Sequence, residues 1–179
     1  MNWLDLVASE KMDSSGAAHT ITQSCSLIQE IIGKPETVLC VGCGSGYELN
    51  MWSNAEGIDL NDVSLQKCRN QGFIVYKEDM HKMSFKDNSY ELVYSRDVFE
   101  HAISPIEAIS EMARVSSKYV AIVLPDESWQ WSKWHFIIPT IRQMISLGEK
   151  ANLMLKSMRE YNINLGTTNI QQSLYLFQI

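Results

Sequence analysis

Acidic and sulfur-containing side chains lie at or just after the ends of two short expected strands in this chain of 179 residues. Asp59 ends a brief strand expected at 56–59, and Asp79 with Met80 comes just after an apolar strand expected at 73–76. A carboxylate can accept hydrogen bonds from both hydroxyls of a ribose or from an adenine amino group, and a thioether packs well against an aromatic ring. These residue types at strand ends predict a binding site for a nucleoside.

A glycine-rich stretch precedes these acids. Residues 38–41 are apolar without alternation, which is typical of a strand that is buried on both faces. Three alternate glycines follow, Gly42, Gly44 and Gly46. Glycine lets the backbone turn sharply and approach a ligand closely, because it has no Cβ. The Gly-Lys-Ser/Thr of a phosphate-binding P-loop does not follow, and Tyr47 is too bulky for the dinucleotide fingerprint G-x-G-x-x-G/A.

Further side chains are candidates for catalysis. Ser95 ends an apolar run and is expected beside the bound cofactor. His101 is the first candidate for a general base, which is needed only if the acceptor must lose a proton. His135 and His19 are the second and third candidates, and for all three histidines a structural role is the alternative.

Aromatic and sulfur-containing residues leave alternatives open. Three tryptophans lie close together in the sequence: Trp129, Trp131 and Trp134. They predict either an aromatic wall that contacts the acceptor, or apolar side chains that pack the C-terminal helix onto the sheet. Cys40 and Cys43 have C-x-x-C spacing, but no second ligand pair follows, so we expect free buried thiols and no metal site.

Alternating strands and helices are expected to position these residues. The expected strands are 38–41, 56–59, 73–76, 90–95 and 119–124, and the expected helices are 17–32, 47–54, 62–70 and one that begins at 105. Five alternations predict an α/β fold with a Rossmann-like, doubly wound, mostly parallel sheet and helices on both faces. In such sheets ligands bind at the carboxyl ends of the strands, where the candidate residues lie.

The remaining elements complete a sheet of about seven strands. Asn61 is expected to cap the helix at 62–70, and Ser104 to begin a capping box before the helix at 105. A long, mostly helical segment is expected over 135–161. Strands at 162–165 and 171–179 would then form an antiparallel hairpin at one edge of the sheet.

We expect a single domain over 1–179. Its parts are an N-terminal helical segment (1–35), a cofactor-binding core (36–125), and a C-terminal part (126–179) with the aromatic loop, the long helix and the terminal strands.

Composition limits the class of protein. The chain is 45% hydrophobic and 20% charged, which is ordinary for a globular domain, and the net charge of −6 argues against a dedicated nucleic-acid binder. Four cysteines among apolar segments indicate a reducing compartment, and neither a signal peptide nor a membrane span is expected, so we predict a cytoplasmic location. The oligomeric state stays open.

Taken together, the motifs resemble those of the class I S-adenosylmethionine-dependent methyltransferases, especially the methyltransferase type 11 group. Residues 38–46 resemble motif I, 57–60 the ribose motif, 78–80 with 83–85 the adenine motif, 90–95 with 99–101 the fourth-strand motif, and 111–115 the helix before strand five. The resemblance covers about residues 36–125.

The resemblance implies S-adenosylmethionine as the cofactor. The residues it implies for binding are Gly42, Cys43, Gly44, Gly46, Asp59, Leu60, Asp79, Met80 and Ser95. Two departures from the pattern stand out. Cys40 replaces the acid that the family usually has, and the short interval between Gly46 and Asp59 implies that the intervening helix is trimmed by about a turn.

The implied activity is transfer of a methyl group to a small-molecule or glycan-like acceptor by direct in-line displacement. Residues 95–98 do not match the Asp-Pro-Pro-Tyr type of motif of amino-methylating DNA enzymes, which argues against nucleic acid as the acceptor. A catalytically weak, methyltransferase-like binding module is the alternative, and a nicotinamide enzyme is a third hypothesis that Tyr47 disfavours.

Overall fold

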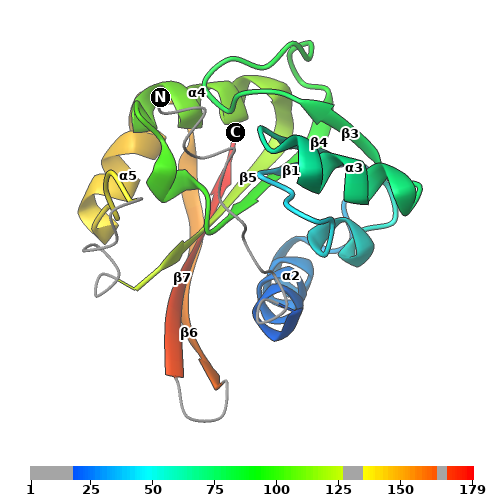
Figure 1. Ribbon diagram of the computed structural model, residues 1–179. Helices are drawn as coiled ribbons and strands as arrows, with labels where there is room; N and C mark the ends of the chain where they lie inside the picture. Colours follow the sequence, from blue (N-terminus) through cyan, green and yellow to red (C-terminus); the bar gives the residue numbers. More distant parts are fainter. Residues whose placement is uncertain (1–17, 127–134, 165–168) are drawn as a thin grey trace.

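The computed structural model describes residues 18–126, 135–164 and 169–179 (Figure 1). Its strands are β1 (Val38–Val41), β2 (Ala55–Asp59), β3 (Ile74–Lys77), β4 (Tyr90–Arg96), β5 (Ser116–Pro125), β6 (Met154–Asn164) and β7 (Asn169–Gln178). Its α-helices are α2 (Ala18–Ile32), α3 (Asp62–Asn70), α4 (Pro105–Val115) and α5 (Ile141–Lys150), and its 3₁₀ helices are η2 (Glu48–Met51) and η3 (Phe99–His101). None of the helices in these ranges is long and apolar enough to cross a membrane.

All seven strands belong to one sheet, in the order β3-β2-β1-β4-β5-β7-β6. Strands β1 to β5 pair in parallel, while β7 is antiparallel to both β5 and β6. The strand order reverses between β1 and β4, and crevices at such reversals are where α/β sheets bind ligands. The predicted Rossmann-like sheet with an antiparallel C-terminal hairpin is confirmed.

Helices pack on both faces of the sheet, as predicted (Figure 1). On one face Ile28 of α2, Leu49 of η2 and Leu65 of α3 share a buried apolar cluster. On the other face Met112 of α4 and Met144 of α5 belong to a second cluster. All four residues of β1 are buried between the two clusters, which explains why that strand is apolar without alternation.

The long helix predicted over 135–161 is wrong. Helix α5 covers only Ile141–Lys150, and β6 begins at Met154. The direction changes at Asn152, whose φ of +59° lies in the left-handed region that Asn tolerates better than most residues. Near the end of β6, buried Tyr161 and Ile163 alternate with exposed Glu160 and Asn162, which is the period of a strand with one buried face.

Two further local predictions need correction. The helix expected over 47–54 is a single 3₁₀ turn, η2. The side chain of Ser104 makes no capping bond, and its backbone N–H donates instead to Nε2 of His81 at 3.3 Å. The predicted cap of α3 is confirmed, because Oδ1 of Asn61 accepts from the backbone N–H groups of Val63 and Ser64.

Candidate functional site

The glycine turn begins where β1 ends. Gly42 has a φ of +71°, and a Cβ built on it would lie 2.3 Å from Cγ2 of Val98, so a larger residue would be strained and would clash. Gly44 has a φ of +50°, but a Cβ built there would meet no atom within 4 Å. The side of the turn at Gly44 is therefore open to a ligand, whereas Gly42 permits close packing within the protein.

The carboxylate of Asp59 fixes this turn to the end of β2. Its Oδ2 accepts the backbone N–H of Gly44 and its Oδ1 accepts that of Asn61, each at 2.8 Å. Burial raises the pKa of Asp59, and these two backbone hydrogen bonds oppose the shift. Because a carboxylate has about four lone-pair sites, Asp59 remains able to accept a ribose hydroxyl. Leu60 continues the chain beside this carboxylate.

The predicted adenine residues follow β3. Oδ1 of Asp79 accepts the backbone N–H of His81 at 2.9 Å and lies 2.6 Å from the Nδ1 atom of the same ring. Since Nε2 of His81 accepts the N–H of Ser104, the Nδ1 proton points to Asp79. Met80 packs against the apolar cluster beneath α4. Asp79 keeps a side-chain exposure of 33%, so its second oxygen is accessible to a ligand.

Ser95 lies next to the end of β1, in register with Val41. Its side chain is 1% exposed, and its Oγ has no hydrogen-bond partner among the described residues. A buried hydroxyl without a partner costs free energy, which a ligand with a polar atom at this position would recover. The open turn at Gly44 and the orphaned hydroxyl of Ser95 both fit a nucleoside cofactor with a polar tail.

Cys40 and Cys43 are free thiols, as predicted. Burial, with a further contribution from the charge of Glu48, raises the pKa of the Cys40 thiol well above its ordinary value. Cys40 is therefore neutral at physiological pH and does not replace the charge of the acid usually found at its position. Within the described ranges the cluster of potential metal ligands does not include either cysteine.

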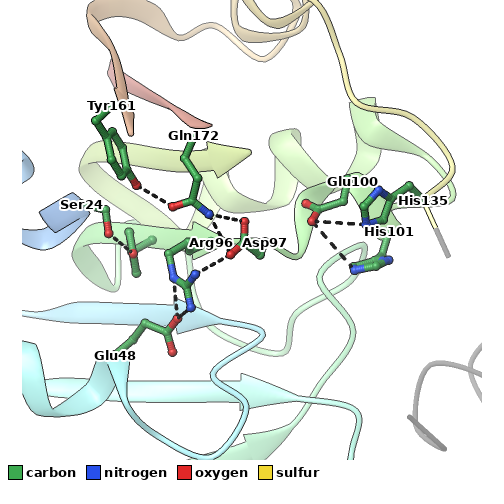
Figure 2. A network of polar contacts seen from close by, with 10 residues as sticks. Ser24, Glu48, Arg96, Asp97, Glu100, His101, His135, Tyr161 and Gln172 are labelled. Atoms are coloured by element: carbon green, nitrogen blue, oxygen red, sulfur yellow. Dashed lines mark hydrogen bonds and ion pairs between the residues drawn. The ribbon is translucent and has the colours of Figure 1, made fainter. Parts of the chain in front are cut away.

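Sequence reasoning missed a buried ion pair beside the turn (Figure 2). The guanidinium of Arg96, at the end of β4, lies 3.1 Å from Oε1 of Glu48 through both Nε and an Nη atom, and it also contacts the carboxylate of Asp97. Burial raises the pKa of Glu48 while Arg96 lowers it. Arg96 directly follows residues 90–95, which were compared with the fourth-strand motif, but its partner on η2 is distant in sequence, so only the fold shows the pair.

The polar network continues into the C-terminal hairpin. Nε2 of Gln172 donates to both carboxylate oxygens of Asp97, at 2.7 and 2.9 Å, and the hydroxyl of Tyr161 donates to Oε1 of Gln172 at 2.9 Å. Asp97 has a φ of +52°, an uncommon backbone conformation outside glycine. Side chains from β6, β7 and the β4 end thus fix the segment that leads from Asp97 to η3 (Figure 2).

The candidate base, His101, ends η3 beside two other polar residues. Its Nε2 lies 4.0 Å from Oε1 of Glu100, and Nε2 of His135 lies at the same distance from that oxygen. The two imidazole rings are 5.1 Å apart and meet edge to face. Two of the three predicted histidines therefore come together. The side chain of His19 and the three tryptophans lie outside the residues described.

Comparison with known families identifies the core of this chain. Residues 39–123 match the family model of a methyltransferase domain, of the type 11 group. The matched segment contains the glycine turn, Asp59, Asp79, Ser95 and His101. No curated protein matches the chain in a sequence search.

Solved structures share the fold at low sequence identity. A methyltransferase from Methanosarcina mazei is 16% identical with a TM-score of 0.72, covering 85% of this chain and 96% of its own. A possible histamine N-methyltransferase from Thermotoga maritima is 14% identical with a TM-score of 0.74, covering 90% and 88%. A magnesium protoporphyrin IX methyltransferase from Synechocystis, solved with bound SAH, is 10% identical with a TM-score of 0.72, covering 91% and 83%. At these identities the likeness shows the fold.

Proposed function

Since residues 39–123 form a class I methyltransferase domain of the type 11 family, we propose that the chain transfers a methyl group from S-adenosylmethionine to a small-molecule or glycan-like acceptor. The prediction of S-adenosylmethionine as cofactor is confirmed at the level of the family. The observation that carries the proposal is the convergence at one sheet edge of the open turn at Gly44, the carboxylate of Asp59 and the orphaned hydroxyl of Ser95.

Each of these residues has a role that follows from its chemistry. We assign the ribose hydroxyls to Asp59, whose oxygens keep lone pairs after bonding the turn. Asp79 would accept from the adenine amino group, with Met80 beside the ring. The backbone from Gly42 to Gly46, with Cys43, would line the methionine part of the cofactor together with Ser95.

Methyl transfer makes few demands on the protein. S-adenosylmethionine supplies a methyl group on a sulfonium sulfur, which is already an activated leaving group. The protein must align the acceptor with that methyl group and exclude water. Where the acceptor carries a proton that must leave, His101 is our candidate for the base, because its side chain is only 15% exposed yet lies near the β4 end.

Two observations support a small-molecule acceptor. Two of the structural neighbours are named for small molecules, histamine and magnesium protoporphyrin IX, which supports a small acceptor. The net charge of −6 again disfavours nucleic acid. The cytoplasmic location is part of this proposal, supported by four cysteines that are free and buried.

An extract experiment tests methyl transfer and identifies the acceptor. The protein is incubated with a small-molecule extract of host cells and S-adenosylmethionine labelled on the methyl group, and products are followed by mass spectrometry. With S-adenosylmethionine below saturation, we expect a labelled product whose amount falls by about tenfold to a hundredfold with Asp59→Ala and is unchanged with Asp62→Ala, a control at an exposed acid on α3. Cofactor binding without any labelled product from small-molecule or glycan pools would favour the methyltransferase-like binding module instead.

A further inference from the structure

Three potential metal ligands meet between η3 and the segment that leads to α5: Glu100, His101 and His135. Their ligand atoms all lie within 4.8 Å of one another. We propose that these side chains bind a divalent transition metal ion of the Zn²⁺ class, in a site next to the methyl-transfer site and separate from the cofactor residues.

The spacing of the three side chains suits one ion. Oε1 of Glu100 lies 4.0 Å from Nε2 of His101 and 4.0 Å from Nε2 of His135. Ligands of a single tetrahedral Zn²⁺, each about 2.0–2.2 Å from it, are about 3.3–3.5 Å apart, so each of the two gaps from Glu100 would close by about half an ångström on binding. The two histidines, whose ligand atoms lie within 4.8 Å of each other, would also move closer together. Rotation of imidazole and carboxylate side chains covers that distance without backbone movement. In Figure 2 both rings face the same carboxylate.

Backbone hydrogen bonds bring the two parts of the site together independently of any ion. The carbonyl oxygen of Glu100 accepts from the N–H of Phe136 at 2.9 Å and from that of Ile137 at 3.4 Å. The N–H of His101 donates to the carbonyl of Val98 at 3.0 Å, closing η3. His135 is thus fixed next to η3 although it is distant in sequence, so little order is lost when an ion binds.

Glu100 has a buried oxygen that is able to bind a cation. Its side chain is 2% exposed, and its Oε2 has no hydrogen-bond partner in the described part of the chain. A buried carboxylate is costly unless it is paired or coordinates a metal. The histidine side chains are 15% and 9% exposed, so the cluster is reached from solvent along their edges. Water or an acceptor atom would fill the remaining coordination positions.

The donor set selects the class of metal. Two imidazole nitrogens and one carboxylate oxygen form a set used for catalytic Zn²⁺ and for other first-row transition ions. Mg²⁺ and Ca²⁺ prefer oxygen ligands alone. An ion on Nε2 of His101 would occupy the lone pair that a general base needs, so metal ligation and proton abstraction are alternative roles for this residue.

Metal titration of the full-length protein tests the site. Chelator-treated protein is titrated with Zn²⁺ by calorimetry and with Co²⁺ by visible absorption, which reports the coordination directly. We expect one ion per chain, with no competition from Mg²⁺. Glu100→Gln, His101→Ala and His135→Ala should each weaken binding by more than the roughly 10- to 100-fold that loss of an outer-shell partner costs. His19→Ala, on α2, is the matched control and should bind as the wild type does.

Several outcomes would overturn the proposal. Absence of stoichiometric Zn²⁺ and Co²⁺ binding would show that the cluster is not a metal site. Binding that survives all three substitutions would place the ion elsewhere, for example on cysteine thiols. Competition by Mg²⁺ at equal concentration would refute the metal class. Circular dichroism identifies any variant that fails to fold, and His135→Gln then replaces the alanine variant.

Discussion

At the scale of single residues, the carboxylate of Asp59 accepts one backbone N–H on each of its oxygens, from Gly44 and from Asn61. An acid that only held ribose could be removed from the free protein at little cost. Asp59 also fixes the glycine turn against β2 and the start of α3, so its replacement acts on the fold as well as on the site.

We expect Asp59→Ala to change two quantities at once. It should weaken S-adenosylhomocysteine binding by about tenfold to a hundredfold, since charge-assisted hydrogen bonds contribute roughly 1.5–3 kcal/mol. It should also lower the free energy of unfolding without ligand by about 1–3 kcal/mol, because two partly buried N–H groups lose their acceptor. Asp59→Asn should lose less of both, because its amide oxygen still accepts one bond. Calorimetry measures the affinity, and urea unfolding measures the stability. Unchanged affinity in Asp59→Ala would show that the ribose does not bind to this residue.

The buried pair of Glu48 and Arg96 predicts an asymmetry between its two partners. Arg96→Leu leaves the carboxylates of Glu48 and Asp97 without their cation and should destabilise the fold by about 3–5 kcal/mol. Glu48→Gln should cost less, about 1–2 kcal/mol, because its amide oxygen still accepts from Arg96, which also keeps Asp97. Urea unfolding compares the two variants. If both variants lost the same unfolding free energy, the guanidinium of Arg96 would not be shared between Glu48 and Asp97.

The residues predicted from the sequence are those whose role depends on a local strand end, such as Asp59 and Ser95. Their position next to a glycine turn is visible in a short stretch of sequence. Glu48 and Gln172 were missed because their partners are distant in sequence and no periodic pattern marks them. His135 was found by its residue type, but its position beside Glu100 depends on how the segment before α5 folds back.

At the scale of elements, α5 and β7 pack through a close contact. A Cβ built on Gly148 of α5 would lie 2.4 Å from Cε1 of Phe177 in β7. Gly148 is helical, and alanine is the better helix former by about 1 kcal/mol. Packing and propensity therefore oppose each other at this position.

We expect packing to dominate in Gly148→Ala. The clash with the buried ring of Phe177 should destabilise the protein by about 1–3 kcal/mol despite the gain in helix propensity. Ser146→Ala, at an exposed position of the same helix, should be neutral or slightly stabilising. Thermal unfolding of the two variants measures the difference. A Gly148→Ala protein at least as stable as the wild type would show that α5 shifts freely on the sheet.

Helix α4 fixes the segment after the adenine residues through Glu111 and Arg114. Oε2 of Glu111 accepts the N–H of Met83 at 2.8 Å, and the guanidinium of Arg114 donates to both oxygens of Glu111 and to the carbonyl of Phe85. The hydrogen bonds from Arg114 lower the pKa of Glu111 below its ordinary value of 4.5, while partial burial opposes them.

This lowered pKa gives a pH dependence of stability with a defined sign. The contribution of Glu111 is fully present above its unfolded pKa and is lost as the pH falls through the folded pKa. Between about pH 6 and about pH 3, Glu111→Gln should therefore lose less unfolding free energy than the wild type, by about 1 kcal/mol. Urea unfolding at both pH values provides the comparison, and parallel losses in the two proteins would show that Glu111 titrates normally.

Elements with local start and stop signals were predictable. Asn61 marks the start of α3, and an unbroken apolar run marks β1. The switch from α5 to β6 could not be predicted from the sequence. Asn152 turns the chain without an adjacent glycine or proline, and the residues around it are compatible with a helix. In the capping box predicted at Ser104, the backbone N–H that Glu107 would have bonded donates to His81, which is distant in sequence.

At the scale of the whole molecule, the parallel strands and the C-terminal hairpin of the sheet have different roles. Strands β1 to β4 bring the proposed cofactor residues to one edge, while the β6–β7 hairpin extends beyond them and supplies Tyr161 and Gln172 to the network behind Asp97 (Figure 1). β6 is an edge strand with exposed charges at Lys156 and Arg159, and such charges disfavour strand pairing between copies.

Calorimetric titration of the purified protein with S-adenosylhomocysteine tests the central claim, a nucleoside cofactor at the carboxyl ends of β1, β2 and β4, most directly. We predict saturable binding of one molecule per chain, and no saturable binding of NADH, because Tyr47 occupies the position where a dinucleotide turn needs a small residue. No binding heat with S-adenosylhomocysteine at millimolar concentration, or saturable binding of NADH in its place, would contradict the claim.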